Sequence, residues 1–215
     1  LEQLVQERSA QLAATLEEVR ASREYTLQAL SAMLNAYEPG TGQHSVRAHA
    51  MTLILGRELG LKGDDLEVVA QGALLHDIGK IGVSLDVLTS TGSLAPGDWQ
   101  AVRRHPETAY RILSATPHLR TVARIVYEHH ERYDGSGYPR GLAGESICLG
   151  ARIFAVVDAY DAMRSVRVYK TSVSQEDARA EIVRCSGTHF DPTVVEVFAA
   201  RLTVTSPVPS VPSTR

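Results

Sequence analysis

Apolar side chains recur at helical spacing along most of this chain, and no segment alternates convincingly between apolar and polar residues as a strand does. The first 36 residues contain no Gly or Pro, which favours one uninterrupted helix. Helical patterns follow over residues 44–60, 64–75, 99–104, 106–113, 118–130, 149–165, 174–185 and 192–202. The sequence therefore predicts an all-α fold, and its 215 residues suffice for one sizeable core.

The N-terminal segment has the spacing of a coiled-coil seam. Its seam positions alternate in steps of four and three, and they are Leu12, Leu16, Val19, Arg23, Thr26, Leu30, Met33 and Tyr37. We expect residues 1–37 to form a signalling helix that pairs in parallel with a second copy, with Leu16, Leu30 and Met33 at the centre of the seam. An ordinary amphipathic surface helix has the same periodicity and stays an alternative.

Breaks in the helical pattern suggest where the main domain begins and ends. Pro39 and Gly40 interrupt the first helix, and residues 133–146 are a predicted loop because glycines crowd into them. Residues 203–215 are rich in Ser, Pro and Thr, which predicts a disordered tail. We therefore expect the domain to span residues 38–202. Because the chain begins with Leu1 and not Met, we also expect it to be part of a longer protein.

Composition excludes several classes of protein. A formal net charge of −3 gives no general attraction to polyanions, so binding to nucleic-acid polymers is not expected. Cys148 and Cys185 lie far apart and outside any Cys-x-x-Cys pair, which argues against a disulfide framework or a thiolate zinc site and suits a reducing cytoplasm. No apolar run approaches the roughly 20 residues that cross a bilayer, so we expect no membrane segment here.

Histidine and aspartate carry most of the chemical information. The candidates, most of them near expected breaks between helices, are His44, His76, Asp77, His105, His129, His130 and Asp158. Imidazole and carboxylate groups suit iron, manganese, zinc and similar ions, and one carboxylate can bridge two of them. Taken singly, each residue has an ordinary explanation as a helix cap or a solvated polar group. Residues 74–82, however, set polar side chains into an apolar run, where a metal would offset the cost of their burial.

Two motifs resemble those of a known family. The run His76-Asp77-Ile78-Gly79-Lys80 resembles the name-giving motif of the HD phosphohydrolase superfamily. Residues 129–139, which read HHERYDGSGYP, resemble the long second motif that defines its HD-GYP branch. The similarity extends over about residues 38–202. It implies an HD-domain helical bundle behind the N-terminal helix and an enzyme that hydrolyses phosphodiesters.

The resemblance also implies a binuclear metal site. One ion would be held by His44, His76, Asp77 and Asp158, and the other by Asp77, His105, His129 and His130, with Asp77 as the bridge. Relatives with a third metal have Glu where this chain has Gly40, so two ions are expected, by resemblance iron or manganese, with zinc and nickel also compatible. In the family, a water or hydroxide shared by the ions attacks phosphorus.

Further residues are candidates for contacts with substrate. Asp77 and Lys80 are the expected catalytic residues, with the Lys80 ammonium directed toward the phosphate or the attacking hydroxide. Arg167 and Lys170 resemble a basic segment that holds a second phosphate, although alone they would be interpreted as a solvated stretch. The loop with Gly135 and Tyr138 is expected beside the site.

The resemblance implies cyclic di-GMP as substrate, cleaved to linear pGpG with GMP as a further product, under the control of an upstream sensory or receiver domain. It also implies contacts with proteins that make cyclic di-GMP, the diguanylate cyclases. Three alternatives stay open. They are a non-catalytic regulatory module, a phosphodiesterase for another cyclic dinucleotide such as cyclic GMP-AMP, and a different HD-type nucleotide phosphohydrolase.

Overall fold

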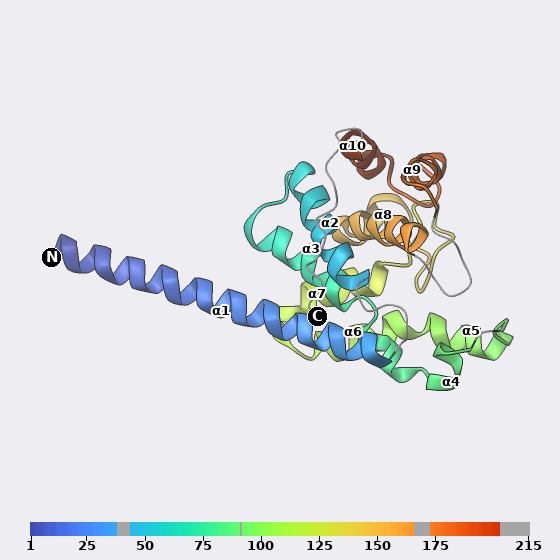
Figure 1. Ribbon diagram of the computed structural model, residues 1–215, viewed down its shortest axis with the longest axis horizontal. Coiled ribbons are helices and arrows are strands. Elements are labelled where there is room, and N and C mark those ends of the chain that lie inside the picture. Colours follow the sequence, from blue (N-terminus) through green and yellow to red (C-terminus); the bar gives the residue numbers. More distant parts are fainter. Residues whose placement is uncertain (38–43, 91, 166–172, 203–215) are drawn as a thin grey trace.

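The computed structural model describes residues 1–37, 44–90, 92–165 and 173–202, and its regular elements within these ranges are all helices (Figure 1). In chain order they are α1 (Glu2–Tyr37), α2 (His44–Glu58), α3 (Gly63–Leu75), η1 (Ile78–Gly82), α4 (Leu85–Leu88), α5 (Pro96–Arg103), α6 (His105–Ser114), η2 (Pro117–Leu119), α7 (Arg120–Glu128), η3 (Gly144–Ser146), α8 (Leu149–Arg164), α9 (Gln175–Arg184) and α10 (Pro192–Leu202). The all-α class is confirmed.

Helix α8 is the centre of the larger hydrophobic core. Its residues Ile153, Phe154, Val156 and Val157 are at most 1% exposed. Helices α2, α9 and α10 lie around it in Figure 1, and all three contact it. A helix that is apolar on most of its sides is stable only when other elements cover those sides. Because α8 is covered on these sides, polar residues that lie on them are drawn into the domain, where Asp161 is 3% exposed and the side chain of Asp158 is 27% exposed.

A second core joins α3, α6 and α7. Val122, Ala123 and Val126 of α7 and Ala109 of α6 are fully buried in it. These small and β-branched side chains allow the helix axes to approach closely. The ends of α3 and α7, and the beginning of α6, therefore meet in one region of the molecule.

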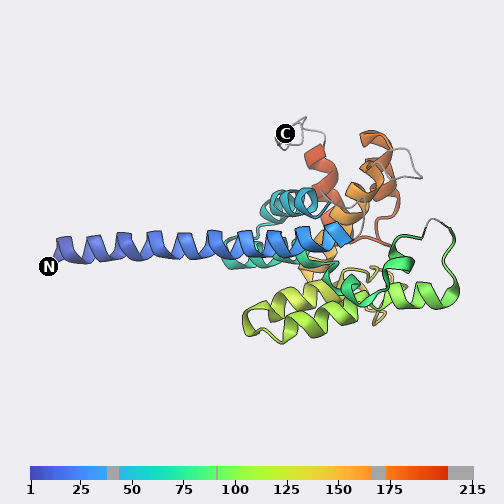
Figure 2. The same ribbon diagram turned by 60° about the horizontal axis from the view of Figure 1, so that its bottom comes forward.

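Helix α1 has two different halves. Residues 1–22 of the chain are all exposed, and the first part of the helix projects away from the body of the molecule (Figures 1 and 2). Further along, Leu27 and Ser31 are buried at 5% and 4% exposure, and Leu27 belongs to the second core. The expected domain boundary at residue 38 thus does not coincide with a break in packing.

Arg23 was expected on a seam between two chains, but its side chain contacts the domain of its own chain. Its Nη2 donates a hydrogen bond to Oε1 of Gln71 at 2.9 Å and lies 3.7 Å from Oε1 of Glu67. Both partners belong to α3 of the same chain. The 3.6-residue period turns Arg23 and Leu27 toward the domain, because a straight helix does not keep one stripe aligned with a strict seven-residue repeat.

Other departures from the expected elements are local. Helix α4 was not predicted, because four residues are too few to establish a period. Helix α5 begins at Pro96, whose missing N–H costs nothing in the first turn, and not at Trp99. The single helix expected over residues 118–130 is divided into η2 and α7. The expected helix break at Pro39 and Gly40 and the expected tail over residues 203–215 lie outside the described residues.

We predict that Leu27→Ala lowers the free energy of unfolding by about 2–5 kcal/mol, because it leaves a cavity between α1 and the second core. Chemical denaturation followed by circular dichroism would measure this change. Leu12→Ala is the matched control, since Leu12 is 71% exposed. Equal effects of the two substitutions at low protein concentration would contradict the packing of α1 on the domain.

Candidate metal centre

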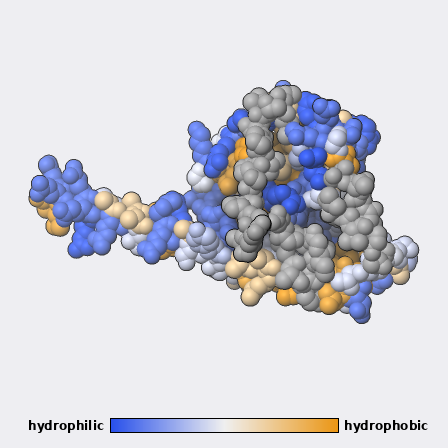
Figure 3. Space-filling view, in the orientation of Figure 1, coloured by the Kyte–Doolittle hydropathy of each residue, from blue (hydrophilic) through white to orange (hydrophobic). Residues whose placement is uncertain are grey.

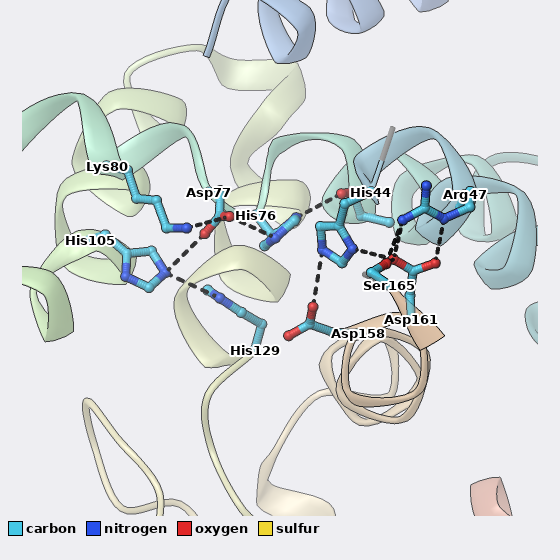
Figure 4. A network of polar contacts seen from close by, with 11 residues as sticks. His44, Arg47, His76, Asp77, Lys80, His105, His129, Asp158, Asp161 and Ser165 are labelled. Atoms are coloured by element: carbon cyan, nitrogen blue, oxygen red, sulfur yellow. Dashed lines mark hydrogen bonds and ion pairs between the residues drawn. The ribbon is translucent and has the colours of Figure 1, made fainter. Parts of the chain in front are cut away.

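Two groups of metal-binding side chains lie next to each other inside the domain. The first is His44, His76 and Asp158, and the second is His105, His129 and His130. Within each group, one candidate ligand atom per residue lies within 4.8 Å of the others. Figure 4 shows most of these side chains turned toward a common centre.

The carboxylate of Asp77 lies between the two groups. Its Oδ2 is 3.1 Å from Nε2 of His76, and its Oδ1 is 3.6 Å from Nε2 of His105. Each oxygen therefore faces a histidine of a different group (Figure 4). This is the arrangement that a bridging carboxylate needs.

Helix ends position most of these residues, as the sequence predicted. His44 and His105 begin α2 and α6, whereas His76 and His129 directly follow α3 and α7. Asp158 is the exception, because it lies within α8. The core helices meet at these ends, so residues far apart in the sequence reach the same centre.

Gly79 allows this meeting. A Cβ atom at this position would overlap the backbone carbonyl of His105 and lie 2.7 Å from the amide nitrogen of Ala109. Backbone cannot move aside as the end of a flexible side chain can, so η1 packs on α6 only with glycine here. That contact brings Asp77 to His105.

Backbone hydrogen bonds orient three of the histidines. The Nδ1 atoms of His76, His105 and His129 lie 2.9, 2.8 and 2.6 Å from the carbonyl oxygens three residues earlier in the chain. A carbonyl can only accept, so each Nδ1 carries the proton and each Nε2 keeps its lone pair. Nε2 is then the atom available to a metal ion.

His44 is oriented by a carboxylate. Its Nδ1 is 2.6 Å from Oδ2 of Asp161, and its Nε2 is 3.1 Å from Oδ1 of Asp158. Arg47 in turn donates two hydrogen bonds to Asp161, from Nε at 2.7 Å and from Nη2 at 2.9 Å. A carboxylate behind a histidine fixes its ring and makes its far nitrogen a stronger ligand.

The charges of the two groups differ. Burial lowers the pKa of His44 by itself, but Asp158 and Asp161 more than offset this and raise it to about 9. In the second group, burial lowers the pKa of His105, His129 and His130. The pKa of His130 is lowered to about 4. The imidazoles of the second group are thus neutral at pH 7, as metal ligands must be.

The carboxylates are ionised. Burial opposes the charge of Asp77, but the nearby His76 and Lys80 hold its pKa well below the usual range. The pKa of Asp158 is lowered in the same way, against burial, mainly by its hydrogen bond with His44. The neutral imidazoles of the second group, together with these anionic carboxylates, form a donor set that fits divalent cations.

Lys80 lies beside the centre. Its Nζ is 2.9 Å from Oδ2 of Asp77, and its side chain is only 15% exposed. The 3₁₀ turn of η1 brings the two side chains together. The ammonium group therefore adds positive charge where an anionic substrate would approach the centre.

The loop after His130 packs against the second group. The ring of Tyr138 stacks on that of His130 at 4.8 Å between centroids and an interplanar angle of 27°, and the Arg103 guanidinium lies 4.4 Å from the Tyr138 centroid. Gly135 adopts a φ of 82°, which favours glycine and turns the chain. The contacts described for Gly135 lie within this loop.

Sequence reasoning missed the residues that support the centre. Asp161 and Arg47 were not assigned roles, although each follows a predicted ligand by three residues on the same helix, a spacing that puts side chains on one face. Buried Glu131 was also missed, and it accepts hydrogen bonds from the backbone N–H groups of Arg140 and Leu142. Arg167 and Lys170, the candidates for phosphate contacts, lie outside the described residues.

Comparison with known proteins identifies the family of this chain. Residues 28–194 match the model of a family described as HD domain. The chain belongs to this family and, by its motifs and relatives, to the HD-GYP branch.

A cyclic di-GMP phosphodiesterase of Vibrio cholerae is 37% identical over 204 residues, which cover 88% of this chain and 42% of the relative. The cyclic di-GMP phosphodiesterase response regulator RpfG of Xanthomonas campestris is 36% identical, over 87% of this chain and 50% of its own. A 3′3′-cGAMP-specific phosphodiesterase of V. cholerae is also 36% identical, over 82% of this chain and 38% of the relative. The chain thus spans half or less of the length of these relatives.

Solved structures agree on the fold. A cyclic GMP-AMP specific phosphodiesterase of V. cholerae superposes with a TM-score of 0.63 at 21% identity, over 83% of this chain and 49% of that structure. An HDG"Y"P protein from Bdellovibrio bacteriovorus gives a TM-score of 0.62 at 23% identity, over 82% of this chain and 57% of that structure. Among the described residues, no helix is long and apolar enough to span a membrane.

We predict that Asp161→Asn weakens metal binding by about 10- to 100-fold, because an amide neither orients His44 as firmly nor makes it as basic. Titration of the metal-free protein with Mn²⁺ or Zn²⁺ would measure the affinity. Asp177→Asn, an exposed substitution at the start of α9, is the control. Unchanged affinity in Asp161→Asn would mean that the carboxylate does not support His44 as a ligand.

Proposed function

We propose that this chain is a metal-dependent phosphodiesterase that hydrolyses cyclic di-GMP to linear pGpG, with GMP as the product of a second cleavage. The observation that carries the proposal is the Asp77 carboxylate, whose two oxygens face histidines of two neighbouring ligand groups. Relatives named as phosphodiesterases for cyclic di-GMP and for 3′3′-cGAMP support the substrate class. Cyclic GMP-AMP is therefore the alternative substrate.

The proposed site holds two divalent ions, iron or manganese in preference to zinc or nickel. His44, His76, Asp77 and Asp158 would hold one ion, and Asp77, His105, His129 and His130 the other. When bound, the ions would supply an activated water and offset negative charge on the phosphoryl oxygens. The neutral imidazoles of His105, His129 and His130 and the ionised carboxylates of Asp77 and Asp158 support this assignment.

The chain's own residues would orient the substrate. Lys80 is the proposed catalytic cation, because its ammonium group is already at the edge of the ligand groups beside Asp77. Arg167 and Lys170 stay proposals for the second phosphate. Gly135 and Tyr138 are proposed to border the bound nucleotide, and the same loop is the proposed contact with diguanylate cyclases.

We predict different results for two substitutions at the centre. Asp77→Ala should leave both metal positions empty or weakly held, because one carboxylate offsets charge on two ions. Lys80→Ala removes no ligand, so the metal content should survive while turnover of cyclic di-GMP falls by about 100-fold. Metal analysis and a chromatographic assay for pGpG would measure the two effects. The opposite pattern of metal loss would reverse the proposed roles.

The same assays separate the alternative functions. A folded, metal-loaded protein that cleaves cyclic GMP-AMP and leaves cyclic di-GMP intact would transfer the proposal to that substrate. Fewer than about one bound ion per chain after anaerobic purification would favour a non-catalytic regulatory module. The retention of all seven proposed ligands argues against that module.

We further propose that α1 pairs with α1 of a second copy. The projecting half of the helix carries apolar surface among hydrophilic surface (Figure 3). The exposed apolar side chains there are Leu4, Val5, Leu12, Leu16 and Val19, each at least 50% exposed. A helix of this length without tertiary contacts is marginal in water, and parallel pairing would bury the stripe. Pairing would also join two upstream sensory or receiver domains to two HD-GYP domains in the cytoplasm.

Deletion of residues 1–19 should convert the dimer to a monomer, as measured by sedimentation. This deletion spares Arg23 and Leu27, whose contacts with the domain a longer deletion would remove. Double substitution of Leu12 and Leu16 by Glu is a second test that keeps the helix at full length. A dimer that persists in both variants would refute pairing through α1.

A further inference from the structure

Helix α5 presents two side chains that the proposed reaction does not use. Trp99 and Arg103 are four residues apart, so they lie on one face of the helix, separated by about 6 Å along its axis. Trp99 is the chain's single tryptophan and is 56% exposed. No residue of α5 is buried. The indole therefore does not fill the core, and its position on the surface lacks a packing explanation.

Arg103 fixes the end of α5 at the metal centre. Its guanidinium carbon is 4.4 Å from the centroid of Tyr138, and Tyr138 stacks on His130 of the second ligand group. His105 of the same group lies two residues further along the chain. Arg103 thus lies at the border of the centre, and Trp99 lies one helical turn earlier on the same face of α5.

Within the described part of the chain, no residue accepts a hydrogen bond from the side chain of Arg103. Its described contact is with the face of Tyr138, and no hydrogen bond or ion pair involves it. A guanidinium carries its N–H donors in one plane, and contact of its carbon with an aromatic ring does not use them as hydrogen-bond donors. Arg103 therefore offers a planar, two-pronged donor one helical turn from the exposed ring of Trp99.

We propose that Trp99 and Arg103 form a guanine subsite. The indole would stack on one base of the cyclic dinucleotide, and Arg103 would donate hydrogen bonds to O6 and N7 of that base. This inference rests on the proposed function, since a phosphate bound at the ligand groups would bring its attached nucleoside to the border of the site. Stacking on an aromatic side chain suits any base, whereas paired donation to O6 and N7 selects guanine over adenine, which has an amino group in place of O6.

Kinetics test the two roles separately. Trp99→Ala should lower kcat/KM for cyclic di-GMP by about 5- to 150-fold, the effect of losing one base stack, while Trp99→Phe keeps most of the activity. Tyr110→Ala is the matched control, because Tyr110 is an exposed aromatic residue on α6 whose ring contacts that of Tyr127 instead. It should leave kcat/KM unchanged.

Arg103→Gln should change selectivity. The amide of Gln matches N6 and N7 of adenine, so the ratio of kcat/KM for cyclic di-GMP to that for cyclic di-AMP should fall by about 5- to 150-fold. The ratio is informative even if the substitution loosens Tyr138, because general damage to the site lowers both rates together. An unchanged ratio in Arg103→Gln, or unchanged kcat/KM in Trp99→Ala, would overturn the subsite.

Fluorescence of the single tryptophan gives a readout that does not depend on hydrolysis. GMP should quench Trp99 in the metal-loaded chain more strongly than AMP, and Arg103→Gln should abolish that difference. Hydrolysis of cyclic di-GMP without any response of Trp99 to GMP would overturn the subsite and leave the proposed function standing. A selective response to GMP without hydrolysis of any cyclic dinucleotide would support the subsite and refute the proposed function.

Discussion

The packing of η1 against the beginning of α6 is the contact on which the candidate metal centre depends. Gly79 lies so close to the backbone of His105 that no side chain fits there. This approach sets Asp77 between the two ligand groups, with one oxygen toward His76 and the other toward His105. A carboxylate between two clusters of imidazoles is the feature that distinguishes this centre from an ordinary buried ion pair.

The rest of the centre is built to keep those ligands in one orientation. Backbone carbonyls one helical turn earlier hold the rings of His76, His105 and His129, so helix geometry itself selects the nitrogen that faces inward. For His44 the acceptor is a side chain instead: Asp161 faces its Nδ1, and Arg47 anchors Asp161. Two structural solutions therefore give the same result, an Nε2 directed at the common centre.

Helix α1 connects the N-terminal end of this chain to the helix that precedes His76 and Asp77. Its second half belongs to the core through Leu27 and contacts α3 through Arg23, and α3 ends where His76 and Asp77 begin. A rotation of α1 would therefore act on α3, the helix that His76 and Asp77 follow. In the first half, the described contact with the domain is that of Arg20 with Asp64 at 3.4 Å, so the proposed pairing with a second copy could set such a rotation.

The sequence by itself determined the helical class, most helix positions and the identity of the clustered residues, because periodicity and the two HD-GYP motifs are local properties of the chain. It did not reveal that Asp161 would support His44, that Leu27 would join the core, or that Arg103 would contact Tyr138 beside the centre. Those relations depend on which helix faces meet, and many faces are compatible with the same periodicity. Only the tertiary structure decided them, since burial and close backbone approach are properties of the packed molecule and not of any segment.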